Sequence, residues 1–228
     1  MSRNLKLIRL ANDARKLMSV EDRTQEPWFS VQNAADESAT VRIFGAIGDP
    51  FEGLDAAAFV DQLDQIAADT INLQINSPGG LVFDGVAIYD ALQSHSATVD
   101  VLVSGVAASA ASFIAMAGDS VAITKSSKMM IHDAAGLVIG NAQSMRQMAD
   151  LLDDLSDTIA DVYADRSGRS ADEWRAAMRT ESWYGSADAV AAGLADRVAN
   201  DKSNRGPSGP DNKTRLIRVR HEGLRGGL

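Results

Sequence analysis

The chain has 228 residues, 45% of them hydrophobic, so it can bury one substantial core and is most simply one domain with flanking segments. Its formal net charge of -9 argues against a general nucleic-acid binder. It contains no cysteine, which excludes disulfides and cysteine nucleophiles and fits a reducing cytoplasm, the compartment that we predict. We also expect no membrane span, because no run of about 18 apolar residues occurs.

Composition divides the chain into three regions. We predict an N-terminal arm over residues 1–27, a folded domain over residues 28–200 and a C-terminal tail over residues 201–228. The arm is loosely amphipathic, and charges interrupt it too often for a secretory signal. The tail is glycine-rich and carries seven Lys and Arg residues against three Asp and Glu residues. Such a tail is typical of a solvated extension, and a docking tail for an acidic partner is the alternative.

The first half of the folded region alternates strand and helix patterns. The strands are expected at residues 29–31, 41–46, 71–75 and 99–103, and the helices at residues 54–68 and 82–92. Each predicted helix is followed directly by an apolar strand. This alternation is the signature of an α/β layer.

The second half continues the same alternation after a short Ala-rich helix that follows Ser109. Strands are expected at residues 121–123, 129–131, 136–140 and 194–198. Helices are expected at residues 143–165, 171–178 and 187–192, with Ser170 as the N-cap of the second. The helix over residues 143–165 is the longest and carries an apolar stripe.

Ser109 stands where a β-branched run gives way to the Ala-rich helical pattern. A serine in the first turn of a helix has free backbone N–H groups and the positive end of the helix dipole beside it, which favours an anionic oxygen there. The position suits the nucleophile of an acyl transfer. The alternative is that Ser109 only caps the helix, as many serines at such junctions do.

Two further segments point to the same chemistry. Gly79 and Gly80 end an apolar strand, and adjacent glycines let backbone N–H groups approach a ligand closely, as an oxyanion hole requires. His132 ends the apolar run of residues 129–131, where it is a candidate general base.

Several motifs together resemble one known family. They are Asn76 to Gly80, Gly105 with Ala107 to Ser109, Ala117 with Gly118, Met130 to His132, and Ser186 with Ala187 followed by Val190, Gly193, Leu194 and Asp196. They keep their order over roughly residues 40 to 198, and motifs in register are far more specific than any one alone. The chain resembles the proteolytic subunit of the Clp protease, within the Clp/crotonase fold group.

The resemblance implies an α/β fold, a Clp/crotonase-like spiral of repeated ββα units with a protruding handle helix over about residues 133–167. It also implies a serine endopeptidase that needs no cofactor and no metal. Ser109 would attack the peptide carbonyl, His132 would take and return the proton, and the N–H groups of Gly80 and Ala110 would hold the oxyanion. Gly79 and the segment Gly136, Leu137, Val138 and Ile139 would bind an extended substrate by strand addition.

The third member of the catalytic set departs from the family pattern. The family's aspartate falls on Ser182 in this chain. A hydroxyl can fix the histidine tautomer but cannot stabilise an imidazolium as a carboxylate does, so the neighbouring Glu181 is an alternative. Asp133 is less favoured, because adjacent residues on a strand point to opposite faces. Ser77, Ser104 and Ser112 are alternative serines, but Ser104 lies within the strand and Ser112 one turn inside the helix, so neither of these two has the access of Ser109 to free N–H groups.

The resemblance also implies partners. We expect a homo-oligomer, a heptameric ring or double ring, in which the apolar stripe of the handle is buried between subunits and the N-terminal arm is a candidate gate. The substrates would be polypeptides, and a separate AAA+ unfoldase would supply any unfolding, because the chain has no phosphate-binding loop of the Gly-x-x-x-x-Gly-Lys type. Neither nucleic acid nor membrane is expected as a partner.

Three other functions compete with this interpretation. A phage or prophage head-maturation protease has the same fold, and the missing aspartate leans towards such a variant. A structural ring would keep the fold and lose efficient catalysis. An acyl-CoA enzyme of the crotonase type shares the oxyanion hole, but a paired Ser109 and His132 are more naturally those of a peptidase.

Overall fold

A computed structural model describes residues 28–33, 38–48 and 56–199 of the chain. The predicted N-terminal arm and basic tail lie outside the described residues, as do residues 34–37 and 49–55.

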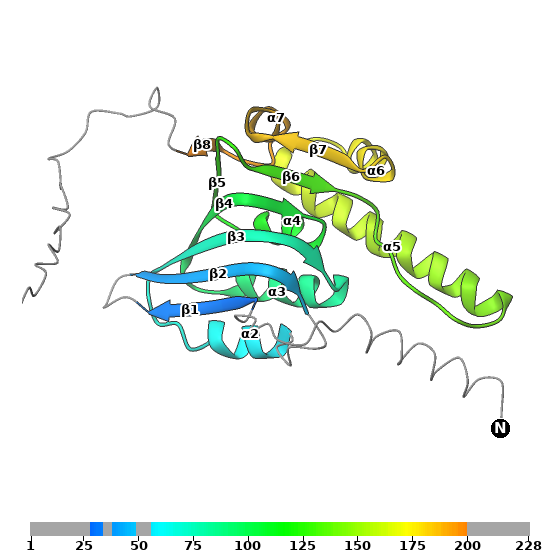
Figure 1. The fold of residues 1–228 in the computed structure, drawn as a ribbon, viewed down its shortest axis with the longest axis horizontal. Helices are drawn as coiled ribbons and strands as arrows, with labels where there is room; N and C mark the ends of the chain where they lie inside the picture. Colours follow the sequence, from blue (N-terminus) through cyan, green and yellow to red (C-terminus); the bar gives the residue numbers. More distant parts are fainter. Residues whose placement is uncertain (1–27, 34–37, 49–55, 200–228) are drawn as a thin grey trace, which may run out of the picture.

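The described strands form one mixed sheet (Figure 1). They are β1 (Phe29–Asn33), β2 (Ser38–Ile47), β3 (Thr70–Gly80), β4 (Thr98–Ala108), β5 (Ser120–Thr124), β6 (Lys128–Ile131), β7 (Ser182–Gly185) and β8 (Arg197–Ala199). The order is β1-β2-β3-β4-β5-β8, and β6 pairs with both β4 and β7. The pairs from β2 to β5, the β5–β8 pair and the β4–β6 pair are parallel, whereas β1 and β7 each join antiparallel.

The described helices pack around this sheet and extend from it. They are α2 (Ala56–Leu63), α3 (Val82–Ser94), α4 (Ala110–Ala115), α5 (Ala142–Ser167), α6 (Ala171–Arg179) and α7 (Ser186–Ala192). Burial alternates along β3 and β4, so Ile71, Leu73 and Ile75 of one strand and the valines of the other enter the core. Period-two alternation of this kind is what a parallel strand with one well-covered face produces. The predicted α/β fold class is confirmed.

Helix α5 projects from the body of the molecule (Figure 1). Its C-terminal half is anchored in the core through Ile159 and Tyr163, while Met145 near its start is 51% exposed. Asn141 caps the helix by accepting hydrogen bonds from the amides of Gln143 and Ser144, a contact of about 1 kcal/mol in comparable helices. The handle is therefore half core helix and half protrusion.

Most of the predicted elements are confirmed, with β3 and β4 longer than predicted and β8 shorter. Ser170 caps α6 with a full capping box, as its position predicted. The strand predicted at residues 136–140 is wrong, because this segment pairs with no described strand. Its apolar side chains face outward, with Leu137 86% and Ile139 83% exposed. Strand β7 was not predicted.

No helix of the described ranges combines the length and apolar character that crossing a membrane requires.

Candidate active site

The turn at Ser109 has an unusual backbone. Strand β4 runs to Ala108, helix α4 begins at Ala110, and Ser109 between them has φ 53° and ψ -125°. A non-glycine residue at positive φ is strained and persists only where its surroundings hold it. One support is direct, because the Ser109 amide donates to the carbonyl of Met130 over 2.9 Å. The Ser109 side chain caps no backbone amide of α4, so the capping interpretation is wrong.

The end of β3 lies directly against this turn. Gly79 has φ 93°, and a Cβ on it would meet the Ala108 carbonyl oxygen at 2.6 Å and the Ala110 nitrogen at 2.9 Å. Ser77 is fully buried and holds this bend, since its Oγ donates to the Gly45 carbonyl over 2.6 Å and accepts from the Gly79 amide over 3.0 Å. Only glycine allows the two strand ends to approach so closely.

His132 meets Ser109 through the register of β6. That strand lies parallel to β4 with Ala108 opposite Met130, so the histidine two residues later arrives beside the serine. The distance between His132 Nε2 and Ser109 Oγ is 2.7 Å, a hydrogen bond within the range expected of a nucleophile and its base. Both side chains are partly exposed and therefore accessible.

A pocket of about 130 Å³ opens at this pair and includes both residues predicted for the oxyanion hole. Gly80 and Ala110 line it together with Ser109 and His132. Ala110 is the first residue of α4, so its N–H has no partner within the helix. The remaining wall is mostly apolar and is formed by Val82, Phe113, Ala134, Ala135, Ile159 and Tyr163, with Asp133 beside them.

A buried hydroxyl pair supports Ser109 from behind. The Ser112 Oγ donates to the Ser109 carbonyl over 2.6 Å and lies 2.8 Å from the Tyr163 hydroxyl of helix α5. Burial raises the pKa of Tyr163 well above its ordinary value, although its hydrogen bond with Ser112 acts in the opposite direction. The phenol therefore stays neutral and holds Ser112 in place. Ser112 is fully buried and, like Ser77, is a support and not a second nucleophile.

Neither of the residues predicted to orient His132 forms a hydrogen bond with its ring. The Ser182 Oγ donates to the Ala177 carbonyl over 2.8 Å, and Glu181 accepts from the Trp183 indole over 3.1 Å. Within the part of the chain that the structure describes, the only hydrogen bond of the His132 ring is the one to Ser109.

The Asp133 carboxylate also bonds elsewhere, to Arg175 of α6. Burial acts to lower the pKa of Arg175, but the hydrogen bonds to Asp133 and Asp157 outweigh it and hold the pKa above its ordinary value. The sequence argument against Asp133 assumed that it lies on a strand with His132. Strand β6 ends at Ile131, so neither residue is on the strand and the argument does not apply.

The predicted substrate-binding residues lie in two separate places, and none of them lines the pocket at Ser109. Gly79 is buried beneath the Ser109 turn and does not line the pocket. The segment Gly136, Leu137, Val138 and Ile139 starts beyond the pocket wall and runs beside α5, where a Cβ on Gly136 would contact Leu152 at 3.5 Å. Ser104 lies within β4, away from the pocket.

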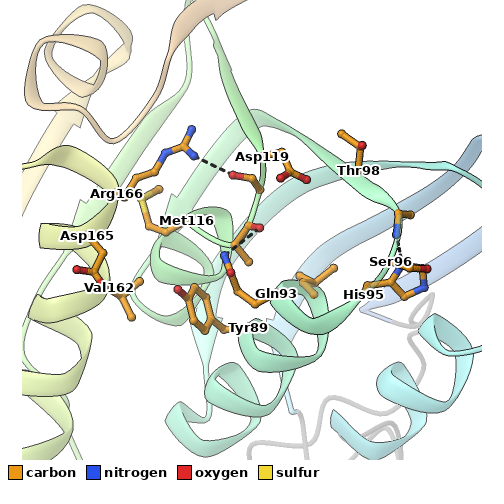
Figure 2. Close-up of a pocket in the computed structure, with 14 residues that line it drawn as sticks. Tyr89, Gln93, His95, Ser96, Thr98, Met116, Asp119, Val162, Asp165 and Arg166 are labelled. Carbon is orange, nitrogen blue, oxygen red and sulfur yellow. Dashed lines mark hydrogen bonds between the residues drawn. The ribbon is translucent and has the colours of Figure 1, made fainter.

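A larger pocket of about 580 Å³ lies elsewhere, between α3, the end of α4 and α5 (Figure 2). Three of its polar residues already bond within the fold: His95 to the Ala97 amide, Asp119 to the Val99 amide and Arg166 to the Gly118 carbonyl. It contains no serine paired with a histidine. We therefore assign it no part in the chemistry, although it is the larger hollow.

Sequence reasoning missed Ser112, Tyr163, Ser156 and Arg175. Of these, only Arg175 carried a signal, as a charged residue on the inner face of an otherwise amphipathic helix pattern. No group of three or more His, Cys, Asp or Glu residues in the described ranges is placed to hold a metal ion.

Comparison with known proteins gives a consistent result. A family model described as Clp protease matches residues 23–202 of the chain. A curated relative from Pleurastrum terricola, named ATP-dependent Clp protease proteolytic subunit, is 26% identical over 189 residues. The match covers 81% of this chain and 95% of the relative.

Proposed function

The chain belongs to the Clp protease family, and on that premise we propose that it is a serine endopeptidase with Ser109 as nucleophile and His132 as general base. The observation that carries the proposal is the 2.7 Å contact between His132 Nε2 and the Oγ of a strained serine that does not cap its helix. Strain at such a turn is expected where a nucleophile must be presented to a substrate.

The proposed reaction follows from the positions of these groups. His132 Nε2 takes the Ser109 hydroxyl proton as Oγ forms a bond to the peptide carbonyl carbon, and the carbonyl oxygen becomes an oxyanion. The N–H groups of Gly80 and Ala110 stabilise that oxyanion. The histidine then gives its proton to the leaving amine, and water releases the acyl group by the same steps.

Nothing in the described ranges contributes a carboxylate to the imidazolium that forms. Ser182 and Glu181, the candidates for this role, bond elsewhere. The proposed catalytic unit is accordingly a Ser109–His132 dyad, and we expect it to be slower than a full triad, in which loss of the aspartate costs about 10⁴ in kcat.

Labelling with a fluorophosphonate tests the nucleophile. We expect the intact protein to be modified at Ser109, Ser109→Ala to lose both labelling and peptide cleavage, and Ser104→Ala to keep both. Ser104 is a matched control, because it is also half-buried and lies on β4, the strand that leads to Ser109. An unmodified protein that cleaves no peptide would favour a structural ring, and turnover of an acyl-CoA without peptide cleavage would favour a crotonase-type enzyme.

We also propose that the peptidase acts inside an oligomeric ring, with polypeptides delivered by a separate AAA+ unfoldase. The supporting observation is the exposed apolar surface of the handle, formed by Leu137, Ile139, Met145 and Leu151. Exposed apolar patches of this kind mark protein contacts. Native mass measurement is expected to show a ring assembly that Ile139→Asp disrupts and Gln147→Asp, an exposed polar position on the same handle, leaves intact.

A further inference from the structure

Arg175 gathers three carboxylates next to the proposed general base. Its side chain is only 7% exposed, and it bonds Asp133 through Nη1, Asp157 through Nε at 2.5 Å and Asp153 through Nη2 at 2.8 Å. Asp153 and Asp157 belong to α5, whereas Asp133 directly follows His132. One guanidinium therefore joins α6, α5 and the segment after the histidine.

A second contact ties the same segment to α5. The amide of Ala134 donates to the Ser156 Oγ over 2.9 Å, and Ser156 is 1% exposed. Ala134 is thus tied to α5 directly, and Asp133 is tied to it through Arg175 of α6. We call this set, formed by Asp133, Ala134, Asp153, Ser156, Asp157 and Arg175, the His132 anchor.

His132 needs such an anchor because little else orients it. Strand β6 ends at Ile131, residues 132–139 have no regular structure, and the ring bonds to Ser109 alone within the described ranges. The direction of the imidazole then depends on the backbone at residue 132, and that backbone depends on where Asp133 and Ala134 are held. A displacement of about 1 Å in a catalytic group can cost on the order of 100-fold in rate.

Joining α5 to α6 does not by itself require Asp133. The bonds from Arg175 to Asp153 and Asp157 already connect the two helices. The third bond, from Arg175 Nη1 to Asp133, reaches a residue that lies outside both helices. The rigid fork of arginine suits such a junction, whereas lysine is a point charge that cannot hold three carboxylates in fixed directions.

We propose that Arg175 is a positioning residue for His132, acting through Asp133. This inference rests on the proposed function, since it concerns the same base. Arg175 itself does not line the pocket, so it does not touch the substrate. The acid–base step depends on it only through the placement of the imidazole.

The test compares Asp133→Asn and Arg175→Lys with the intact protein by fluorophosphonate labelling rate and by kcat and KM for a peptide. We expect both variants to lower the labelling rate and kcat by about 10-fold to 100-fold, while KM stays within about twofold. A merely structural role would leave kcat per labelled site unchanged.

Two control variants separate positioning from charge and stability. Asp154→Asn removes an exposed carboxylate from the same helix without touching Arg175. Asp196→Asn removes a charge from another Arg–Asp pair, the 2.7 Å contact with Arg166. This pair lies outside the pocket at Ser109, so the variant tests loss of stability alone. We expect both controls to keep kcat within about twofold, as unrelated surface charges usually do.

The outcomes distinguish this inference from the function on which it rests. If the intact protein is neither labelled nor active, the proposed function fails. If the intact protein is labelled and Asp133→Asn and Arg175→Lys react at its rate, the inference is overturned and the proposed function stands. If one of the two variants does not fold, the other decides: a reduced rate with unchanged KM supports the inference, and the rate of the intact protein overturns it.

Discussion

A Cβ on Gly79 would lie 2.7 Å from the Cβ of Ser109, closer than real side chains approach. Gly79→Ala must therefore move Ser109 or the end of β3, and it also places a side chain at φ 93°. We expect a loss of kcat of about 100-fold and a loss of about 1–3 kcal/mol in the free energy of unfolding, measured by peptide cleavage and urea denaturation.

Gly168→Ala is the matched control for this substitution. Gly168 also has positive φ, but nothing lies within 4 Å of its added Cβ. We expect a loss of about 1 kcal/mol in stability with normal cleavage. Equal activity losses in the two variants would show that strain in general, and not contact with Ser109, reduces the rate.

The hydroxyl pair behind Ser109 predicts coupled effects on stability. Ser112→Ala removes the donor to the Ser109 carbonyl and leaves the buried Tyr163 hydroxyl unpaired, a cost of about 1–3 kcal/mol. Tyr163→Phe should cost about 1 kcal/mol and reduce kcat less, because Ser112 can still reach Ser109.

The double variant checks this arrangement. Since the unpaired phenol is absent from it, Ser112→Ala combined with Tyr163→Phe should be destabilised by less than the sum of the single changes, by about 0.5 kcal/mol or more. Denaturation of the four proteins measures the coupling. Strict additivity would mean that the two hydroxyls do not act together.

Ser182 offers a gain-of-function test. It pairs with Ile131, one residue before His132, so a carboxylate at this position is well placed to reach the imidazole. We expect Ser182→Asp to raise kcat by about tenfold or more, because an ionised partner stabilises the imidazolium.

Ser182→Ala and Glu181→Gln should change kcat by less than about threefold, since neither native side chain bonds to the ring. A large loss in either variant would identify that residue as the partner of His132 in the working enzyme.

High pH should destabilise the protein through its tyrosines. The chain has three tyrosines, and burial raises the pKa of Tyr89, Tyr163 and Tyr184. Above about pH 10 the unfolded chain releases phenol protons that the folded chain retains, so stability is full below that pH and falls as the pH rises.

Tyr163→Phe removes one of the phenol groups whose proton release differs between the folded and unfolded chains. Its free energy of unfolding should fall less steeply above about pH 10, by up to about 1.4 kcal/mol per pH unit. Urea denaturation at a series of pH values measures the slope. Identical slopes for the two proteins would show that Tyr163 ionises in the folded state as it does in the unfolded one.

The elements could be predicted where local pattern decides them. Ser170 followed by Glu173 specifies the start of α6 through contacts between near neighbours. The segment from Gly136 to Gly140 was misassigned, because an apolar run indicates burial without saying where. Leu137 is apolar and yet exposed, so periodicity alone could not separate it from a core strand.

In the candidate site, too, one part could be predicted from the sequence and another could not. The family resemblance predicted the meeting of Ser109 and His132, whose catalytic roles stay a prediction. The contacts that support them join Ser112 to Tyr163 and Arg175 to Asp133, which are 51 and 42 residues apart. Such long-range polar contacts leave no periodic trace, because their energy depends on where whole helices come to rest.

Helix α5 supports both members of the proposed dyad indirectly. Tyr163 bonds Ser112, which bonds the Ser109 carbonyl, and Ser156 bonds Ala134, two residues after His132. The far end of the helix extends outside the body of the molecule (Figure 1). The C-terminal half of α5 thus lies beside the candidate active site, whereas its N-terminal half is exposed away from it. A contact that shifted the exposed end of α5 would therefore disturb the supports of Ser109 and His132 together, without anything entering the pocket.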